Sequence, residues 1–282
     1  MVKFLFMAAP LEDVSDNAFR ELCFNHGADL TFTEMTRLRS AVDENKSSLR
    51  KISIINNVPT QIQFAVQNEF DLKKFLDKYN PSKNFKGINL NLGCPSPQLI
   101  NLGMGCAMIK RVSQVNSFVK IIQDYGYGSS VKLRLGLNAY EKKMKSYLNL
   151  ITGVDADFFI VHARHGAEHY EVPADYRVFP EIVATGKMII ANGDVDSIRK
   201  VNLLKKMGVA GAMIGRAAVT DPAIFERLKG QKGPSFEELR KDYTLLAEKY
   251  FEANGSNEKY KENVLKRLGK KKVFSEDDNV QG

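Results

Sequence analysis

The sequence predicts a (β/α)8 barrel followed by a short helical appendix. Eight short, apolar and β-branched runs recur about every 25–40 residues, and stretches of helical length separate them. Strands that alternate with helices are typical of parallel βα units, and eight units in about 230 residues match the size of this barrel. The predicted strands lie near residues 4–8, 29–33, 60–65, 87–92, 130–135, 157–162, 187–192 and 210–214.

Polar side chains follow the ends of these eight runs. In a (β/α)8 barrel the carboxyl ends of the strands form the active-site face, so we expect the functional residues to meet there. The strand ends carry Pro10-Leu11-Glu12, Thr33-Glu34-Met35, Gln63, Asn91 to Cys94, Lys132 with Arg134, His162 with Arg164, Asn192-Gly193-Asp194 and Gly215-Arg216. A doubly wound open sheet is the alternative fold, but no GxGxxG follows the first strand.

Composition indicates a globular protein of 282 residues with 44% apolar residues and no run long enough to span a bilayer. The apolar start ends at Pro10 and an acidic pair instead of a cleavage site, so it reads as a first strand in a cytoplasmic protein. Three cysteines form neither a disulfide framework nor a CxxC pair, which fits a reducing compartment. The net charge of +8 suits a polyanionic partner such as nucleic acid, or simply a lysine-rich solvated surface.

The periodicity changes after about residue 230, which divides the chain into a catalytic barrel (1–230) and a helical segment (235–282). Ser235 and Glu238 have the spacing of a capping box that opens a helix. A turn at residues 253–256 precedes a second helix with Lys261, Lys266 and Arg267. A basic run follows at residues 270–272, and the acidic end near residues 276–279 has the composition of a disordered tail.

Cys94 is the leading candidate for a catalytic side chain. Gly93 and Pro95 end the strand 87–92 in a turn, which we expect to present the thiol, partly exposed, beside Asn91. The alternative is a small buried hydrophobe. Cys106 competes with Cys94, because it lies at the expected start of a helix over 105–110, although its neighbours favour a packed core thiol. Cys23 lies within a helical stretch and reads as core.

Lys132 and His162 lie in strands that should be buried. An unpaired buried lysine is costly, so either Lys132 faces an anionic or electron-rich ligand at the barrel mouth or the strand register is shifted by one. The same reasoning applies to His162, whose alternative is a hydrogen-bonded core histidine. His165 and His169 have an i, i+4 spacing, but Gly166 and a nearby proline indicate a loop, so we expect no metal site.

Two loops have the composition of a phosphate site. Asn192-Gly193-Asp194 follows the seventh strand, and Gly215-Arg216 follows the eighth. Barrels often bind phosphate at these two loops, through backbone N–H groups and a helix N-terminus, and Arg216 would add a charged donor. The alternative is a pair of ordinary βα turns.

Taken in order, these motifs resemble those of the tRNA-dihydrouridine synthases over about four-fifths of the chain. The matching segments are Met7 to Glu12, Asn91 to Ser96, Val131 to Gly136, Val161 to Arg164, Asn192 to Asp194, and Met213 to Arg216. The resemblance departs in two places. Members of this family typically carry a longer C-terminal helical domain that grips tRNA, and the loop from Ala163 to Tyr170 is less typical than its flanks.

The resemblance implies an FMN enzyme that reduces the C5–C6 double bond of selected uridines in tRNA, with NADPH as electron source. Reduced FMN would pass a hydride to C6, Cys94 would protonate C5, and Asn91 and Arg164 would contact the substrate. No obligate protein partner is evident. The residues implied to bind FMN are Pro10, Leu11, Glu12, Gln63, Lys132, His162, Asn192, Gly193, Asp194, Gly215 and Arg216.

Two other functions are compatible with such a barrel. One is an FMN enzyme acting on a free pyrimidine, as in dihydroorotate dehydrogenases; the other is an RNA-binding or flavin-sensing module without turnover. The basic charge and the helical appendix favour tRNA over a free pyrimidine. Cys94, Lys132 and His162 together favour an enzyme.

Overall fold

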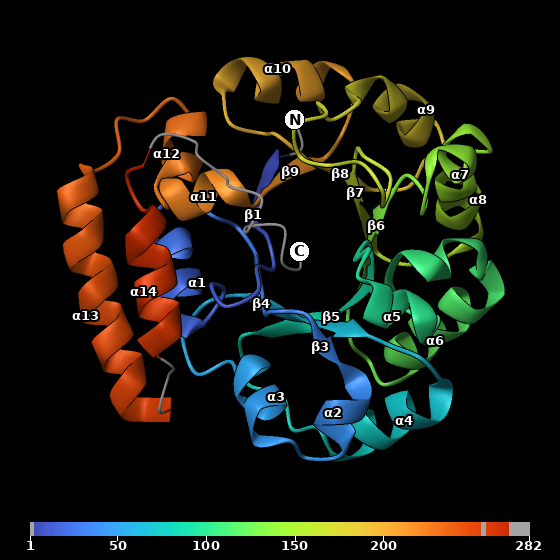
Figure 1. Cartoon of the computed structure of the whole chain (residues 1–282), viewed down its shortest axis with the longest axis horizontal. Helices are drawn as coiled ribbons and strands as arrows, with labels where there is room; N and C mark the ends of the chain where they lie inside the picture. The colour runs from blue at the N-terminus through green and yellow to red at the C-terminus, as the bar shows by residue number, and fades with distance from the viewer. Residues whose placement is uncertain (1–2, 255–257, 271–282) are drawn as a thin grey trace.

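A computed structural model describes residues 3–254 and 258–270 and confirms the parallel barrel with its helical C-terminal region (Figure 1). Eight parallel strands succeed one another around the ring, with β9 paired to β1. A parallel bridge between Met7 and Leu30 closes the ring between β1 and β2. The strands are β1 (Leu5–Ala8), β2 (Thr31–Phe32), β4 (Thr60–Ala65), β5 (Phe85–Leu92), β6 (Ser129–Arg134), β7 (Phe158–His162), β8 (Ile189–Asn192) and β9 (Gly211–Ile214).

All eight predicted runs overlap these strands, and the run 60–65 coincides with β4. A further strand, β3 (Thr36–Arg37), was not predicted. It pairs with the end of β4, with Thr36 opposite Phe64. A two-residue strand is too short to carry an alternating pattern, and this one exists because the chain leaving β2 continues alongside β4.

The inner wall of the barrel has an apolar side and a polar side. Side chains alternate along each strand, so one set packs outward against the helices and the other faces inward. Inward-facing Met7, Phe32, Ile160 and Met213 belong to an apolar cluster separate from the main core. The inward positions of β4, β5 and β6 are instead polar, namely Gln61, Gln63, Asn89, Asn91, Ser130 and Lys132. The interior of the barrel is therefore polar beside β5, the strand that leads into the Cys94 turn.

Helices surround the strands, and several begin at side-chain caps. Asp16, Asn68 and Ser197 each accept a hydrogen bond from the backbone N–H three residues later. The segment predicted as a helix over 105–110 is a 3₁₀ helix. The helices up to the linker are α1 (Asn17–Asn25), α2 (Leu38–Val42), α3 (Lys46–Lys51), α4 (Glu69–Lys78), α5 (Pro97–Asn101), η1 (Gly105–Lys110), α6 (Val112–Asp124), α7 (Ala139–Lys143), α8 (Ser146–Gly153), η2 (Tyr176–Val178), α9 (Phe179–Val183), α10 (Ile198–Lys206), α11 (Arg216–Thr220) and α12 (Ile224–Leu228).

The C-terminal helices α13 (Phe236–Asn254) and α14 (Glu258–Arg267) pack against the barrel beside α1 and α11 (Figure 1). The predicted capping box is present: Ser235 Oγ accepts from Glu238 N, and Glu238 Oε2 accepts from Ser235 N. Tyr243 and Val264 are fully buried in the seam. Residues 271–282, including most of the predicted basic run and the acidic end, lie outside the described residues. In the described part of the chain, no helix has the length and apolar character needed to cross a membrane.

Candidate active site

Cys94 lies in a turn that a buried asparagine holds in place. Asn91 Oδ1 accepts hydrogen bonds from the backbone N–H groups of Gly93 (3.2 Å) and Cys94 (3.0 Å). The expectation of a partly exposed thiol was wrong: Cys94 is only 1% exposed, because Leu99 and Met104 pack over it. Burial raises the pKa of the Cys94 thiol above its ordinary value. Cys94 is therefore a protonated thiol at neutral pH, suited to donating a proton.

A chain of side-chain hydrogen bonds inside the barrel supports this turn. Asn91 Nδ2 donates to Gln63 Oε1, and Gln63 Nε2 donates to Asn89 Oδ1. Asn89 in turn donates to Ser130, which donates to Gln61. Buried amides need such partners, so the chain fixes Asn91 and with it the backbone of the Cys94 turn. Gln63, predicted to bind a cofactor, has both ends of its amide in this network.

The other two cysteines are structural. The Cys106 thiol donates to the Gly93 carbonyl (3.1 Å), and burial raises its pKa to about 12. A thiolate at Cys106 is thus excluded at neutral pH. Cys23 is fully buried in α1, and burial raises its pKa well above the ordinary value. The interpretation of both as core thiols is confirmed.

Lys132 extends from β6 into a cavity at the barrel mouth, so the predicted strand register holds. Burial is the main cause that lowers its pKa to about 8, and the nearby Arg134 adds to the effect. Among the described residues, no hydrogen bond or ion pair of its ammonium group is found. Lys132 is half-buried, and a partly desolvated cation without an anionic partner is costly, which favours a ligand in the cavity.

His162 is neutral, and its tautomer follows from one contact. Burial and the surrounding cations lower its pKa well below 6.5. Arg164 Nη1 lies 3.1 Å from His162 Nε2. A guanidinium can only donate, so Nε2 accepts and the ring proton sits on Nδ1. His162 therefore offers an N–H donor from Nδ1.

Arg164, predicted to contact substrate, is fully buried and bonded to protein groups. Its guanidinium donates to the carbonyl groups of Val172 (2.5 Å) and Tyr170 (3.1 Å), and to Asp194 Oδ2 (2.5 Å). Arg164 thus ties the loop after β7 to the loop after β8. Its substrate contact stays a prediction.

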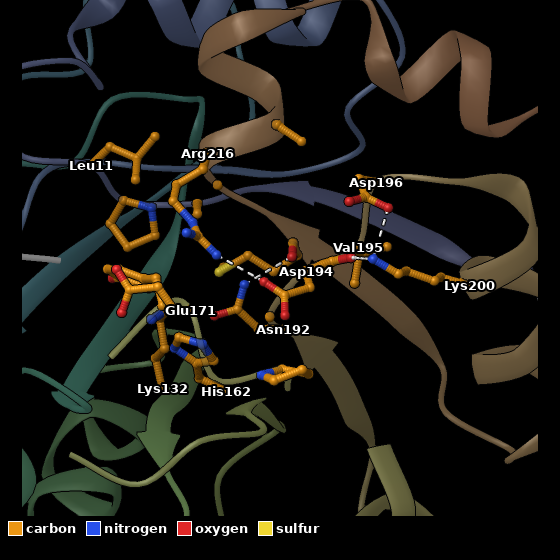
Figure 2. A pocket seen from close by; sticks show the side chains of 18 residues that line it. Leu11, Lys132, His162, Glu171, Asn192, Asp194, Val195, Asp196, Lys200 and Arg216 are labelled. Carbon is orange, nitrogen blue, oxygen red and sulfur yellow. Dashed lines mark hydrogen bonds and ion pairs between the residues drawn. The ribbon is translucent and has the colours of Figure 1, made fainter. Parts of the chain in front are cut away.

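Asp194 joins the two predicted phosphate loops. Its Oδ1 accepts from Arg216 Nη2 at 2.8 Å, as Figure 2 shows, while Oδ2 accepts from Arg164 and from Ala174 N. The Arg216 guanidinium also lies 4.0 Å from the centre of the Tyr170 ring. The arrangement leaves Arg216 oriented over the cavity by a carboxylate on one side and an aromatic face on the other.

Most of the predicted cofactor residues line one cavity of about 380 Å³ at the mouth of the barrel (Figure 2). Its wall carries three cations, Lys132, Lys200 and Arg216, and three carboxylates, Glu171, Asp194 and Asp196. Lys200 pairs with Asp196 and Arg216 with Asp194. The predicted residues on its wall are Pro10, Leu11, Lys132, His162, Asn192, Gly193, Asp194, Gly215 and Arg216. Glu12 and Gln63 are not among them. Tyr170, Glu171 and Lys200 also line it and had no sequence signal, because loop positions follow no period.

Cys94 lines a second cavity, of about 320 Å³, on the side of β3 and α3. Glu12 is here instead, paired with Lys51, which also lies 3.2 Å from Glu34 Oε2. Burial raises the pKa of Glu34 to about 7, and Lys51 is the main opposing influence. Exposed Arg37 and several hydroxyl and amide side chains complete the wall.

One cluster of three acidic residues, among those the structure describes, has the composition of a metal site. Glu12, Asp13 and Glu34 bring one carboxylate oxygen each to within 4.8 Å of the others. Lys51 and Lys259 already pair with these carboxylates, so cations of the protein itself balance them. His165 and His169 lie in the loop after β7, as predicted.

Gly193 is required by its conformation and by close contacts. Its φ is +106°, and a Cβ there would lie 2.9 Å from His162 Cδ2 and 3.0 Å from Ala174 Cβ. We expect Gly193→Ala to lower the free energy of unfolding by about 3 kcal/mol, from backbone strain and overlap together. Gly186 is the matched control, since its φ is +76° but nothing lies within 4 Å of a Cβ. Gly186→Ala should cost only about 1 kcal/mol in urea titrations; equal losses would refute the packing against His162.

Comparisons with known proteins agree with this geometry. A family model described as dihydrouridine synthase matches residues 7–274. A probable tRNA-dihydrouridine synthase of Helicobacter pylori is 31% identical over 254 residues, covering 86% of this chain and 75% of that protein. A probable tRNA-dihydrouridine synthase 2 of Bacillus subtilis is 29% identical over 232 residues, covering 79% and 71%. The tRNA-dihydrouridine synthase B of Pseudomonas syringae is 29% identical over 225 residues, covering 78% and 66%.

Among solved structures, N-(5'-phosphoribosyl)anthranilate isomerase from Pyrococcus furiosus aligns with a TM-score of 0.49 and 12% identity, over 80% of this chain and 98% of that one. That likeness is too distant to bear on function. The family match, by contrast, extends from within β1 over the rest of the barrel and both C-terminal helices. The chain therefore belongs to the dihydrouridine synthase family.

Proposed function

We propose that this protein reduces the C5–C6 double bond of uridines in tRNA, with FMN as its resident cofactor and NADPH as reductant. The observation that carries the proposal is the position of Cys94, a buried and protonated thiol at the end of β5. It lines a cavity whose size suits one nucleotide, and the cavity that Lys132, His162 and Arg216 line lies at the same barrel mouth. Family membership and the names of the relatives support the same reaction.

The hydrogen-bond donors and cations that line the larger cavity match the phosphate and the ring system of FMN. Arg216 and the backbone around Gly193 would hold the phosphate, because both line this cavity. Lys132 would face the electron-rich edge of the ring system, and His162 would add an Nδ1–H donor. Bound FMN would supply the hydride for C6 of uracil. NADPH needs only transient access, which fits the lack of a dinucleotide fingerprint.

Cys94 supplies the proton for C5. The thiol is protonated before the reaction because burial raises its pKa. Lys132 and Arg134 favour the thiolate that remains after proton transfer, because both cations lower the same pKa. Asn91 keeps the donor in place through two backbone hydrogen bonds, and it stays a predicted contact for the uracil edge.

The second cavity suits a nucleotide removed from its stack. Its volume of about 320 Å³ and its hydroxyl-rich wall suit one ribonucleotide, and exposed Arg37 suits a phosphate. An enzyme that acts on a base must take it out of the tRNA stack, which requires such a recess. The net charge of +8 supports a polyanionic substrate.

The test is mass spectrometry of nucleosides from unmodified tRNA after incubation with the purified protein, FMN and NADPH. We expect a fraction of uridine to gain two hydrogens. Dihydroorotate and free uracil should not be turned over under the same conditions. A flavin-loaded protein that leaves tRNA unchanged but reacts with a free pyrimidine would overturn the assignment of substrate.

A further inference from the structure

The C-terminal helix α14 reaches the loop that leaves β1 at the barrel mouth. Lys259 Nζ lies 2.6 Å from Asp13 Oδ2, and Asn263 Nδ2 donates to the Asp13 carbonyl at 3.2 Å. The Tyr260 hydroxyl donates a hydrogen bond to the Glu34 carboxylate. Asn263 and Asp13 are 250 positions apart in the sequence, so this is a tertiary contact between the appendix and the active-site face.

The contacted loop needs external support. Asp13 has a φ of +53°, a left-handed conformation that costs free energy for a residue with a side chain. Its backbone N–H donates to Glu34 Oε2 at 3.0 Å. Asp13 is thus held by Glu34 on one side and by α14 on the other. The adjacent Glu12 takes its position from the same loop.

Glu34 extends this support to the wall of the second cavity. Lys51 bridges Glu34 and Glu12, and both Lys51 and Glu12 line the cavity that contains Cys94. Tyr260 therefore connects to the cavity through a single carboxylate. Tyr260 is itself buried, at 9% exposure, so its hydroxyl acts on the protein interior and not on a nucleic acid.

We propose that α14 is a positioning element of the active site, in which Lys259, Tyr260 and Asn263 fix the Asp13 loop and, through Glu34, the Glu12–Lys51 pair beside Cys94. The catalytic consequence rests on the proposed function. The positioning itself rests on these contacts alone. An appendix that served only to attract RNA would need exposed cations but not these inward contacts.

The first test measures hydrogen–deuterium exchange of the peptide covering residues 11–15, which needs no substrate. We expect about tenfold faster exchange in Tyr260→Phe and in Lys259→Met, because each loses a bond that holds the loop. Lys266→Met is the matched control, since it removes the same charge from an exposed position of the same helix. It should leave this exchange unchanged.

The second test compares kcat with KM for tRNA. We expect Tyr260→Phe to lower kcat about tenfold while KM stays within about twofold. If the charges of α14 attract RNA in general, losing either lysine should raise KM by the same factor in Lys259→Met and Lys266→Met. Only Lys259→Met should also lower kcat. In a Glu34→Gln background, Tyr260→Phe should have little further effect, because it acts through that carboxylate.

Unchanged exchange and unchanged kcat in Tyr260→Phe would overturn the positioning role. If Lys259→Met and Lys266→Met change KM equally and leave kcat unchanged, α14 acts only through its charge, which would also overturn the positioning role. Failure of the wild-type protein to form dihydrouridine would instead overturn the proposed function. The exchange measurement separates the two failures, because it reports the loop without turnover.

Discussion

Replacing Cys94 with alanine is expected to lower dihydrouridine formation by about 10²- to 10⁴-fold, the usual contribution of a positioned acid. The thiol at the end of β5 is the proposed proton donor, and alanine cannot replace its proton. FMN content should not change, because Cys94 is outside the wall of the larger cavity. Nucleoside mass spectrometry over a time course, with flavin absorbance per polypeptide, measures both quantities.

Cys106→Ala is the matched control for this variant. Cys106 is equally buried and its thiol donates to the Gly93 carbonyl, so the variant should lose some stability but keep its rate. Activity as a function of pH gives a second check. A donor works below its pKa, and burial raises that of Cys94, so the wild-type rate should fall only on the alkaline side. A Cys94→Ala enzyme with the wild-type rate would exclude the thiol as the proton source.

The barrel could be predicted because its strands are short apolar runs at regular spacing, and the capping box at Ser235 because it depends on neighbours three residues apart. The 3₁₀ helix over 105–110 depends on distant contacts instead. Gly105 has a φ of +59°, and a Cβ there would lie 2.4 Å from the Cys94 carbonyl oxygen. Cys106 N donates to the same carbonyl. No local pattern encodes a segment fixed by the turn it packs against.

In the candidate site, too, the positions of residues could be predicted from the sequence, but their bonding partners could not. Strand ends converge in any parallel barrel, so position alone brought Lys132, His162 and Arg216 to one cavity. Position alone does not say where a side chain bonds. Gln63 was predicted at a strand end, but it lies within β4 and its amide serves the interior network. Glu12 turns toward Lys51 in the neighbouring cavity. These outcomes depend on partners far away in the sequence.

Replacing Lys132 with methionine is expected to weaken FMN binding by at least about 30-fold while making the cofactor-free protein more stable. A desolvated cation opposite an anionic or electron-rich ligand typically contributes 2 kcal/mol or more to binding, which corresponds to about that factor. Without the ligand, the same charge is a cost, because burial and Arg134 lower its pKa to about 8. Methionine keeps most of the side-chain length and removes the charge. Flavin titrations and urea unfolding of the cofactor-free protein measure the two effects.

The gain in stability should depend on pH in a defined direction. Lys132 has a lower pKa in the folded protein, about 8, than its ordinary value of 10.5. The charged lysine therefore destabilises the fold fully below pH 8, and the penalty disappears as pH rises toward 10.5. Part of the ammonium group touches the open cavity, so we expect a gain of about 1–2 kcal/mol at pH 7 that vanishes near pH 10.

Lys200→Met separates this effect from a general loss of positive charge. Lys200 lines the same cavity, but its ammonium pairs with Asp196 and donates to the Asp194 carbonyl. Its removal should weaken FMN binding less and should not stabilise the cofactor-free protein. A Lys132→Met protein that binds FMN normally, or that is destabilised at pH 7, would show that the ammonium group has no role toward a ligand. Opposite signs for binding and stability would instead identify Lys132 as a residue kept at a cost to the fold for the sake of the cofactor.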